Sequence, residues 1–221
     1  MPDLSAVAVV IPAGPGDRAW EGLLPLLSGF GEVVLSGVAG DDLPPKSGTI
    51  TVTGPAGRAR QLNVGAAASA LPWLLFLHAD SRPDSSLAAG LRRAPDGDYL
   101  GYCTIRYYDG PPWMRLTEAG VWLRSRVFGL PFGDQGMLMS RAVFERLGGF
   151  DERIACGEDH ALVWAARHAG LPLQPLAATL PTSARRYVEA GWWTVTRSHL
   201  AKTWAQARSW RRAGLKAQAS E

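Results

Sequence analysis

The stretch VVIPAGPGDR, from Val9 to Arg18, decides how the rest of the sequence is interpreted. An apolar run ends in Pro12, a glycine-rich turn follows at once, and the helical pattern AWEGLLPLL comes next. A strand, a glycine-rich turn and a helix in this order are how many α/β proteins hold a phosphate group. The turn is therefore a candidate nucleotide-contacting loop, and the rest of the chain has to decide whether it is one. Its candidate binding residues are Pro12, Gly14, Asp17 and Arg18.

The same alternation of apolar runs and helical patterns continues through the first 95 residues. Four apolar runs predict strands at residues 6–11, 32–37, 48–53 and 73–80. Helical patterns predict a short helix at 19–27, interrupted at Pro25, and longer ones at 57–70 and 85–93. Strands joined by helices of this length imply right-handed crossovers, so we expect a mostly parallel sheet flanked by helices.

The second half of the chain is more mixed. Strands are expected at residues 98–108 and 136–140, and helices at 113–128, 141–148 and 158–170. From about Ala190 the pattern predicts one long helix to the C-terminus. Because no repeat or low-complexity linker marks a second domain, we expect one α/β domain over residues 1–190. Residues 191–221 are expected to be an amphipathic helical extension of that domain.

The composition is that of a globular protein. The chain has 221 residues, of which 47% are hydrophobic and 19% charged, which argues against disorder. No run approaches the roughly 20 apolar residues of a membrane span. Two cysteines do not make a disulfide framework, and Asp3 stands where a signal peptide carries basic residues. We therefore expect a cytoplasmic protein.

Polar residues follow two of the predicted strands directly. Ser36 comes at the end of the second strand, and the apolar run WLLFLHAD delivers His78 and Asp80 at the end of the fourth. Ligands bind beyond the carboxyl ends of the strands in open α/β sheets. At strand spacing His78 and Asp80 would share a face and suit a hard divalent cation bound with phosphate oxygens. The alternative is that Asp80 caps the next turn and His78 packs in the core.

Two later motifs carry acids, and each has two interpretations. In GEDHALVWAARHAG, Glu158 and Asp159 begin a helix, where they would either complement its dipole or supply a general base. In GDQG, Asp134 and Gln135 lie between two glycines. That motif is either a tight turn or a means of bringing an acid and an amide to a hydroxylated ligand.

The C-terminal part of the chain is basic. TSARRY contains the adjacent Arg185 and Arg186, which would either bind a diphosphate through their bidentate guanidinium groups or form a surface pair. The net charge is +3, yet from Arg185 onward there are eight Lys/Arg and two acids. Such a tail is either a solvated basic helix or a segment that meets a phosphate-bearing ligand, a membrane surface or nucleic acid.

The predicted C-terminal helix has an aromatic stripe. Trp193, Leu200 and Trp204 fall on one narrow face, and Arg197 and Arg208 lie beside it. Trp and Arg at the edge of an apolar stripe are typical of a helix that lies on anionic lipid. Packing on the domain or on a second subunit, as in a homodimer, explains the stripe equally well.

Together and in this order, these pieces resemble the family-two glycosyltransferases of the GT-A fold. The motifs are GRARQLNVGAAAS, WLLFLHADSRPD, GDQGMLMSRAVFERLGGFDE, GEDHALVWAARHAG and TSARRY, and they span roughly residues 6 to 200. The likeness is greatest to a small bacterial subgroup with HAD at the metal motif. The resemblance implies a Rossmann-like GT-A sheet and inverting transfer of a sugar from a nucleotide-diphosphate donor to an acceptor hydroxyl.

The resemblance also implies roles for individual residues. Asp80 matches the acid that holds Mg²⁺ or Mn²⁺ against the diphosphate, and His78 stands where an Asp is commoner. Asp159 matches the base that deprotonates the acceptor, with Glu158 beside it. The remaining matches are to donor or acceptor contacts: Arg58, Arg60 and Asn63 near the nucleotide, and Arg185 and Arg186 at the diphosphate or acceptor. The acceptor is expected to be a hydroxylated or lipid-linked molecule, with peripheral membrane contact through the C-terminal helix and no nucleic-acid partner.

At two places in the donor site, this sequence has fewer acidic residues than the family usually has. Ser36 and Gly37 stand where an acid usually meets the nucleobase, and the first turn reads AGPGDR where acids are usual. The turn also resembles that of sugar-nucleotide pyrophosphorylases, but the lysine they need soon afterwards is absent, because the first lysine is Lys46. The alternatives are therefore a pyrophosphorylase-like nucleotidyltransferase and a non-catalytic binder of nucleotide sugars.

Overall fold

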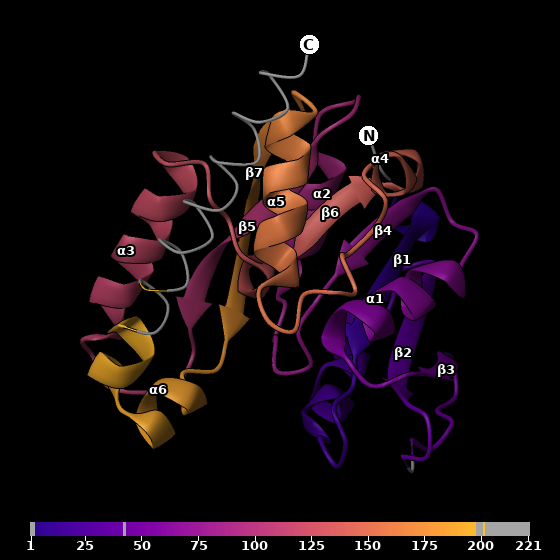
Figure 1. Ribbon diagram of the computed structural model, residues 1–221, viewed down its shortest axis with the longest axis horizontal. Coiled ribbons are helices and arrows are strands. Elements are labelled where there is room, and N and C mark those ends of the chain that lie inside the picture. The colour runs from indigo at the N-terminus through magenta and orange to yellow at the C-terminus, as the bar shows by residue number, and fades with distance from the viewer. Residues whose placement is uncertain (1–2, 42, 198–200, 202–221) are drawn as a thin grey trace.

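The computed structural model describes residues 3–41, 43–197 and 201, and they form a mixed α/β structure around one seven-stranded sheet (Figure 1). The strand order is β3-β2-β1-β4-β6-β5-β7. The strands are β1 (Val7–Pro12), β2 (Glu32–Val38), β3 (Ile50–Gly54), β4 (Trp73–Phe76), β5 (Leu100–Tyr107), β6 (Met137–Ser140) and β7 (Leu173–Thr182). Only β6 runs against its neighbours, β4 and β5, so the prediction of a mostly parallel sheet is confirmed.

Helices cover both faces of the sheet (Figure 1). They are α1 (Arg58–Ala67), α2 (Ser85–Arg92), α3 (Met114–Arg126), α4 (Arg141–Arg146), α5 (Glu158–His168) and α6 (Arg185–Ala190). The short helix predicted near residue 19 is instead two 3-10 helices, Ala19–Gly22 and Leu24–Leu27. Pro25 lies in the first turn of the second one, where its missing N–H costs nothing.

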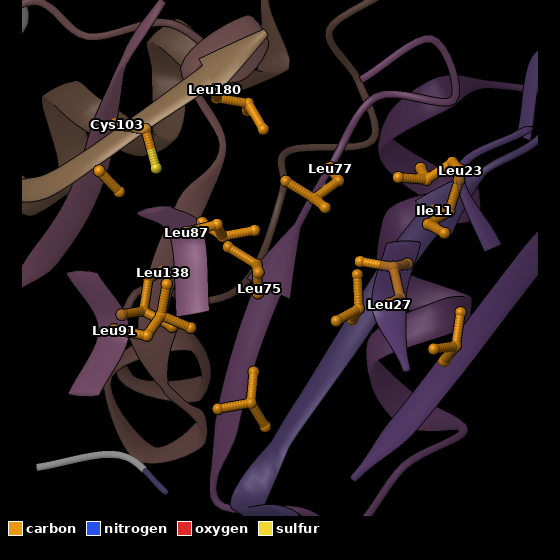
Figure 2. Close-up of a cluster of buried hydrophobic side chains, with 14 of the residues drawn as sticks. Ile11, Leu23, Leu27, Leu75, Leu77, Leu87, Leu91, Cys103, Leu138 and Leu180 are labelled. Carbon is orange, nitrogen blue, oxygen red and sulfur yellow. The ribbon is translucent and has the colours of Figure 1, made fainter. Parts of the chain in front are cut away.

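The core consists of two apolar layers, one on each face of the sheet. The alternation of β1 shows the division: Val9 and Ile11 face the layer that includes α2, and Ala8 and Val10 face the layer of α1, α4 and α5. Figure 2 shows the first layer, where side chains of β1, β4 and α2 meet the leucines of the 3-10 helices. Because every β1 residue is buried, this strand fixes the position of the turn that follows it.

Strand β7 was not predicted from the sequence, and its prolines explain why. Pro175 and Pro181 lie within it and pair with Tyr102 and Arg106 of β5. Proline lacks an N–H donor and is therefore a signal against a central strand. β7 lies at the edge of the sheet, where one side needs no partner, so two prolines are tolerated.

Two other expectations need correction. The strand predicted over residues 73–80 ends at Phe76, so the residues after it are in a turn. The long C-terminal helix does not run through from Ala190, because α6 ends there and Gly191 has a φ of 81°. A new helical segment covers residues 192–197, and residue 201 is helical as well, whereas residues 198–200 and 202–221 of the predicted extension lie outside the described residues.

Candidate active site

A cleft of about 290 Å³ opens beyond the carboxyl ends of β4, β5 and β7. Turn residues after β4, the last residues of β5 and β7, and the start of α5 line it. The cleft brings together these residues singled out from the sequence: Arg58, His78, Asp80, Asp134, Glu158, Asp159 and Arg186. They come from segments more than a hundred positions apart in the chain, so the fold gathers them at one place.

His78 and Asp80 both line the cleft, but not by sharing a strand face. Because β4 ends at Phe76, they lie in a turn in which the Ser81 N–H donates to the His78 carbonyl at 3.1 Å. Asp80 does not cap the helix that follows, since Asp84 accepts the capping bond of α2. Both side chains are half-buried. Both residues thus border the cleft, and their role as cation ligands stays a prediction.

The electrostatics of the turn favour a neutral imidazole. Burial, together with the positive charges of Arg58 and Arg186, lowers the pKa of His78 to about 3. A neutral imidazole has a nitrogen lone pair that can bind a cation. Burial also raises the pKa of Asp80, against the attraction of Arg185 and Arg58. A cation bound in the cleft would favour the ionised form of Asp80 and keep His78 neutral.

Asp134 is the most isolated acid of the cleft. Its Oδ1 atom is buried and accepts no hydrogen bond within the described part of the chain. Burial raises the pKa of this carboxyl despite the nearby Arg124, and the charges of Asp159 and Asp80 raise it further. A buried oxygen without a partner is costly, so this atom is available to an ordered water or to a bound ligand.

Asp159 is held in one orientation by backbone donors. Its Oδ2 accepts the Gly133 N–H at 2.6 Å, and its Oδ1 accepts the His160 N–H at 2.9 Å. Burial opposes ionisation of this carboxyl, but the charge of His160 and the bond from Gly133 outweigh it and lower the pKa. Asp159 is therefore a fixed carboxylate that faces the cleft in its ionised form.

Gly133 lies close to both Asp159 and His78, which come from opposite halves of the chain. A Cβ atom at this position would lie 3.0 Å from Asp159 Oδ2 and 3.1 Å from His78 Nε2. The first distance is at the limit of what real side chains show, so any larger residue displaces one of the two groups. The first glycine of GDQG is thus required by close packing inside the site.

Glu158 acts inside the site as the partner of an arginine. Its Oε1 lies 2.9 Å from Arg58 Nε, and its Oε2 accepts the Gly157 N–H at 3.0 Å. Glu158 is almost completely buried, whereas Arg58 is more than a third exposed at the start of α1. The pair joins the start of α1 to the start of α5, where Asp159 follows Glu158.

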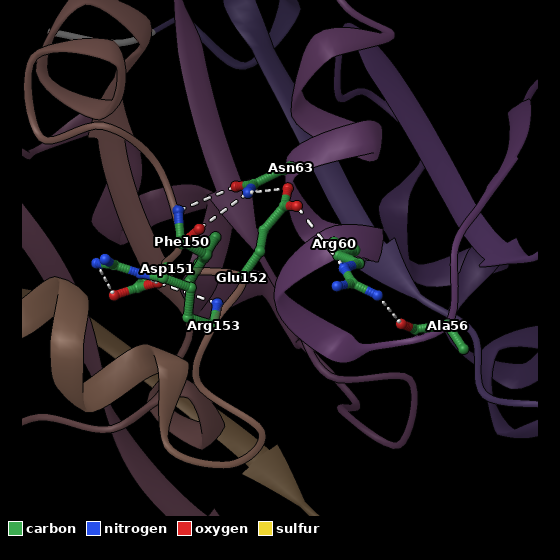
Figure 3. Close-up of polar contacts among 7 residues, drawn as sticks. All are labelled: Ala56, Arg60, Asn63, Phe150, Asp151, Glu152 and Arg153. Atoms are coloured by element: carbon green, nitrogen blue, oxygen red, sulfur yellow. Dashed lines mark hydrogen bonds and ion pairs between the residues drawn. The ribbon is translucent and has the colours of Figure 1, made fainter.

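Two residues predicted from α1 lie elsewhere (Figure 3). Asn63 donates to the Phe150 carbonyl and accepts the Phe150 N–H, both at 2.9 Å, and also donates to Glu152. Arg60 pairs with Glu152 at 3.7 Å and donates to the Ala56 carbonyl. Neither lines the cleft, and the contacts of Asn63 hold the loop that leads to α5.

Gln135 is held in place by four hydrogen bonds. Its Oε1 accepts from Ser125 Oγ at 2.7 Å and from Arg124 and the Phe132 N–H at 3.2 Å. Its Nε2 donates to the Cys103 carbonyl at 2.9 Å. Gln135 is buried by these contacts and does not line the cleft, so its place is a structural one.

The residues of the opening turn also have local partners. Asp17 accepts the Ala19 N–H at 2.9 Å, and Arg18 lies 3.2 Å from Glu21. Ser36 is fully buried beside Pro12, and its carbonyl accepts from the side chain of Gln61, a residue not singled out from the sequence. These residues and Gly14 are not among those that line the cleft, so their part in nucleotide binding stays a prediction.

The aromatic wall of the cleft was not anticipated from the sequence. Tyr107 and Tyr187 contact each other edge to face, with ring centroids 5.6 Å apart, and the Phe132 and His160 rings stack at 3.5 Å. Burial raises the pKa of both tyrosines. Tyr187, next to the arginine pair, and His160, next to Asp159, stood in motifs that were noticed, but neither was predicted to form this wall. Arg185 itself is exposed, pairs with Glu189 and does not line the cleft.

Comparisons with solved structures place the fold. The chain is similar to the mannosyltransferase PcManGT from Pyrobaculum calidifontis, solved with GDP-Man and Mn²⁺, with a TM-score of 0.67 and 17% identity. The alignment covers 92% of this chain and 64% of that one. Two structures of S. aureus TarS match at 15% identity over 80% of this chain, covering 60% and 35% of theirs, with TM-scores of 0.57 and 0.53. The architecture is therefore one that a mannosyltransferase uses.

The sequence itself gives no such match. No protein-family model matches it, and no curated protein matches it significantly. The similarity to these structures is thus one of fold. This chain spans less than two thirds of the length of each of them. Within the described residues, no helix combines the length and apolarity needed to cross a bilayer.

Proposed function

We propose that this protein is an inverting glycosyltransferase of the family-two type, moving a sugar from a nucleotide-diphosphate donor to an acceptor hydroxyl. The observation that carries the proposal is the cleft in which Asp159, an oriented carboxylate, is collected with His78, Asp80 and Asp134. A base and a set of cation ligands in one cleft are the two requirements of metal-assisted glycosyl transfer. The Mn²⁺ and GDP-Man bound by the similar mannosyltransferase support the same chemistry.

The residues of the cleft fit a divalent cation. The buried, unsatisfied Oδ1 of Asp134 and the neutral imidazole of His78 are vacant donor atoms, and Asp80 adds a carboxylate. Within the described residues, no three His, Cys, Asp or Glu side chains converge closely enough to hold an ion on their own. This suits Mg²⁺ or Mn²⁺, which take one or two carboxylates and complete their shell with water and substrate phosphates. Such an ion supplies Lewis-acid stabilisation of the departing diphosphate.

Asp159 is the base in this proposal. It accepts the proton of the acceptor hydroxyl as the hydroxyl oxygen forms a bond to the anomeric carbon of the donor. The bond from that carbon to the diphosphate breaks, and the nucleoside diphosphate leaves with the electron pair. Attack from the face opposite the leaving group inverts the anomeric centre. Because backbone bonds fix both oxygens of Asp159, the base needs little reorganisation during the reaction.

The arginines of the cleft bind the diphosphate in this proposal. Arg58 and Arg186 are its two guanidinium groups, and each offers a bidentate fork for phosphate oxygens. Glu158 orients Arg58 and balances part of its charge. The tyrosine pair of Tyr107 and Tyr187 forms the wall against which a hydroxylated or lipid-linked acceptor rests.

Thermal unfolding with nucleotide diphosphates, with and without Mn²⁺, tests the proposal. We expect one of GDP, UDP or ADP to raise the midpoint, and to do so more strongly with Mn²⁺, because a ligand of the folded state stabilises it by mass action. The same sugar nucleotide should then be hydrolysed slowly in a Mn²⁺-dependent reaction. Asp80→Asn should abolish the Mn²⁺ effect, whereas Asp98→Asn, an exposed acid paired with Arg146, should not.

Other outcomes separate the alternatives. Release of pyrophosphate from a nucleoside triphosphate would identify the nucleotidyltransferase, for which the locally paired Asp17 and Arg18 offer little support. Mn²⁺-dependent nucleotide binding without any sugar release would identify the non-catalytic binder. Hydrolysis that is unchanged in Asp80→Asn would overturn the metal assignment.

A further inference from the structure

The exposed apolar side chains of this protein are concentrated in one part of the molecule. Among the described residues, ten large hydrophobic side chains are exposed, and nine of them fall within residues 108–128 and 188–193. The tenth, Leu26, stands alone on the 3-10 helix Leu24–Leu27. Single exposed apolar residues are normal, but a concentration of them marks a binding surface.

Helix α3 carries most of this surface. Trp113, Leu116, Leu123 and Val127 follow one another at helical spacing, with Gly120 in the middle, so they form one stripe along the helix. Each is between 46% and 68% exposed. The opposite side of α3 is the buried one, formed by Met114, Val121 and Ser125. The helix therefore has an apolar face on each side, and only one of them is used by the core.

The region around α6 continues the same surface. Trp192 donates from Nε1 to Thr117 Oγ1 of α3 at 2.7 Å, and its ring contacts that of Trp193 at 4.7 Å. Trp193 is 72% exposed and Val188 is 63% exposed. α3 and α6 lie side by side at one end of the sheet (Figure 1). We name the set of Trp113, Leu116, Leu123, Val127, Val188 and Trp193 the α3–α6 face.

The charges around the α3–α6 face are unbalanced. Arg115 and Arg126 are exposed on α3, and neither pairs with a carboxylate of the described residues. The nearby acids are occupied: Glu118 accepts the Tyr107 N–H at 2.8 Å, and Asp109 accepts Ser183 Oγ at 2.7 Å. The face therefore combines apolar and aromatic side chains with unpaired cations.

We propose that the α3–α6 face docks on the surface of an anionic lipid bilayer. Trp, Leu and Val would enter the boundary between headgroups and acyl chains, and Arg115 and Arg126 would meet the lipid phosphates. A second copy of the chain is the weaker candidate. A two-fold interface puts the same patch on both sides, which brings unpaired arginines together without an opposing acid. Anionic lipid offers every one of them a partner.

The α3–α6 face lies next to the cleft, so docking on a membrane would bring the cleft close to the lipid surface. Arg186 and Tyr187 line the cleft, and Val188, the next residue, belongs to the α3–α6 face. The cleft thus borders the docked surface. The inference concerns the partner of this face and does not depend on the proposed transfer reaction.

Vesicle flotation of the full chain tests the inference. We expect the protein to float with vesicles containing about 30% phosphatidylglycerol and much less with phosphatidylcholine alone. Leu116→Glu with Leu123→Glu should lower the bound fraction at least about tenfold, because two apolar contacts become anionic. Leu26→Glu, the matched exposed leucine outside the face, should leave flotation unchanged. Arg115→Glu with Arg126→Glu should lower it without removing any apolar contact.

Three results would overturn the inference. The first is wild-type protein that stays with the soluble fraction in both vesicle preparations. The second is unchanged flotation of the α3 variants, which would assign binding to another segment. The third is a wild-type dimer, seen in sedimentation, that the leucine variant splits while flotation persists. Mn²⁺-dependent donor hydrolysis, measured on the same samples, tests the proposed function separately from lipid binding.

Discussion

The opening turn and the cleft after β4 make an instructive comparison. The turn at residues 13–18 has the more conspicuous sequence, yet its polar groups are used locally: Asp17 binds the backbone of Ala19, and Arg18 pairs with Glu21. The cleft is built from short, scattered motifs, yet it holds a neutral His78 and a buried Asp134 oxygen that has no partner among the described residues. A conspicuous sequence motif therefore does not by itself indicate side chains that are free to bind a ligand.

The two regions differ in whether their polar side chains have hydrogen-bond or charge partners. In the opening turn, capping and surface pairing satisfy the side chains, as in many loops. In the cleft, charges and donors are withdrawn from water without complete pairing, which is the usual condition of a binding site. If this comparison is right, substitutions in the cleft should affect activity far more than substitutions in the turn.

The largest effect is expected from Asp159→Asn. The amide keeps the size of the side chain but cannot take up a proton at neutral pH, so sugar transfer should fall by about 10²- to 10⁴-fold. Nucleotide-diphosphate binding, measured by thermal shift, should change little because Asp159 is not among the diphosphate ligands. A variant with full transfer activity would remove the base from the proposal.

Gly133→Ala should come next. The added methyl group would lie 3.0 Å from Asp159 Oδ2, so it must displace the base or the Gly133 N–H that holds it. A displacement of this order can reduce the rate by about 10²-fold. Steady-state kinetics should show the loss in kcat, with the fold intact by circular dichroism. Gly120→Ala is the matched control, because a Cβ atom at Gly120 would meet no other atom within 4 Å. Gly97→Ala is unsuitable as a control because the positive φ of Gly97 strains any other residue.

Asn63→Ala should act on stability. It removes both bonds to the Phe150 backbone and leaves those buried groups without partners, which costs about 1–3 kcal/mol of the free energy of unfolding. Denaturant unfolding measures the loss. Arg60→Ala, which removes an exposed pair with Glu152 and an exposed bond to the Ala56 carbonyl, should change the same quantity by less than about 0.5 kcal/mol. Equal losses in the two variants would contradict the clamp described for Asn63.

The smallest effect is expected from Arg18→Ala in the opening turn. Because the guanidinium is half-exposed and engaged with Glu21, its loss should change donor hydrolysis by less than about twofold. Kinetics at several donor concentrations would reveal a change in KM alone. A rise in KM of tenfold or more would reverse the comparison and restore the turn as a donor-binding loop.

Much of this architecture could be predicted from the sequence because local patterns determine it. β-branched and apolar runs mark β1 to β4, and Asp80 reaches the cleft because it follows the carboxyl end of β4. The acids at the start of α5 line the same cleft. Local patterns could not reveal β7, whose prolines suit only an edge, or the bonds that occupy Gln135 and Asn63. Those depend on partners far away in the chain. The aromatic wall was missed for the same reason, because Tyr107 and Tyr187 meet only in the folded protein.

The prolines of β7 have a further effect on how this protein behaves in concentrated solution. An open sheet edge is a template on which other chains can add strands and build insoluble aggregates. Pro175 and Pro181 supply no N–H on the outermost strand, so an incoming chain finds an interrupted row of hydrogen-bond donors. We therefore expect the same residues that obscure β7 in the sequence to discourage strand addition at this edge of the sheet, the other edge being β3.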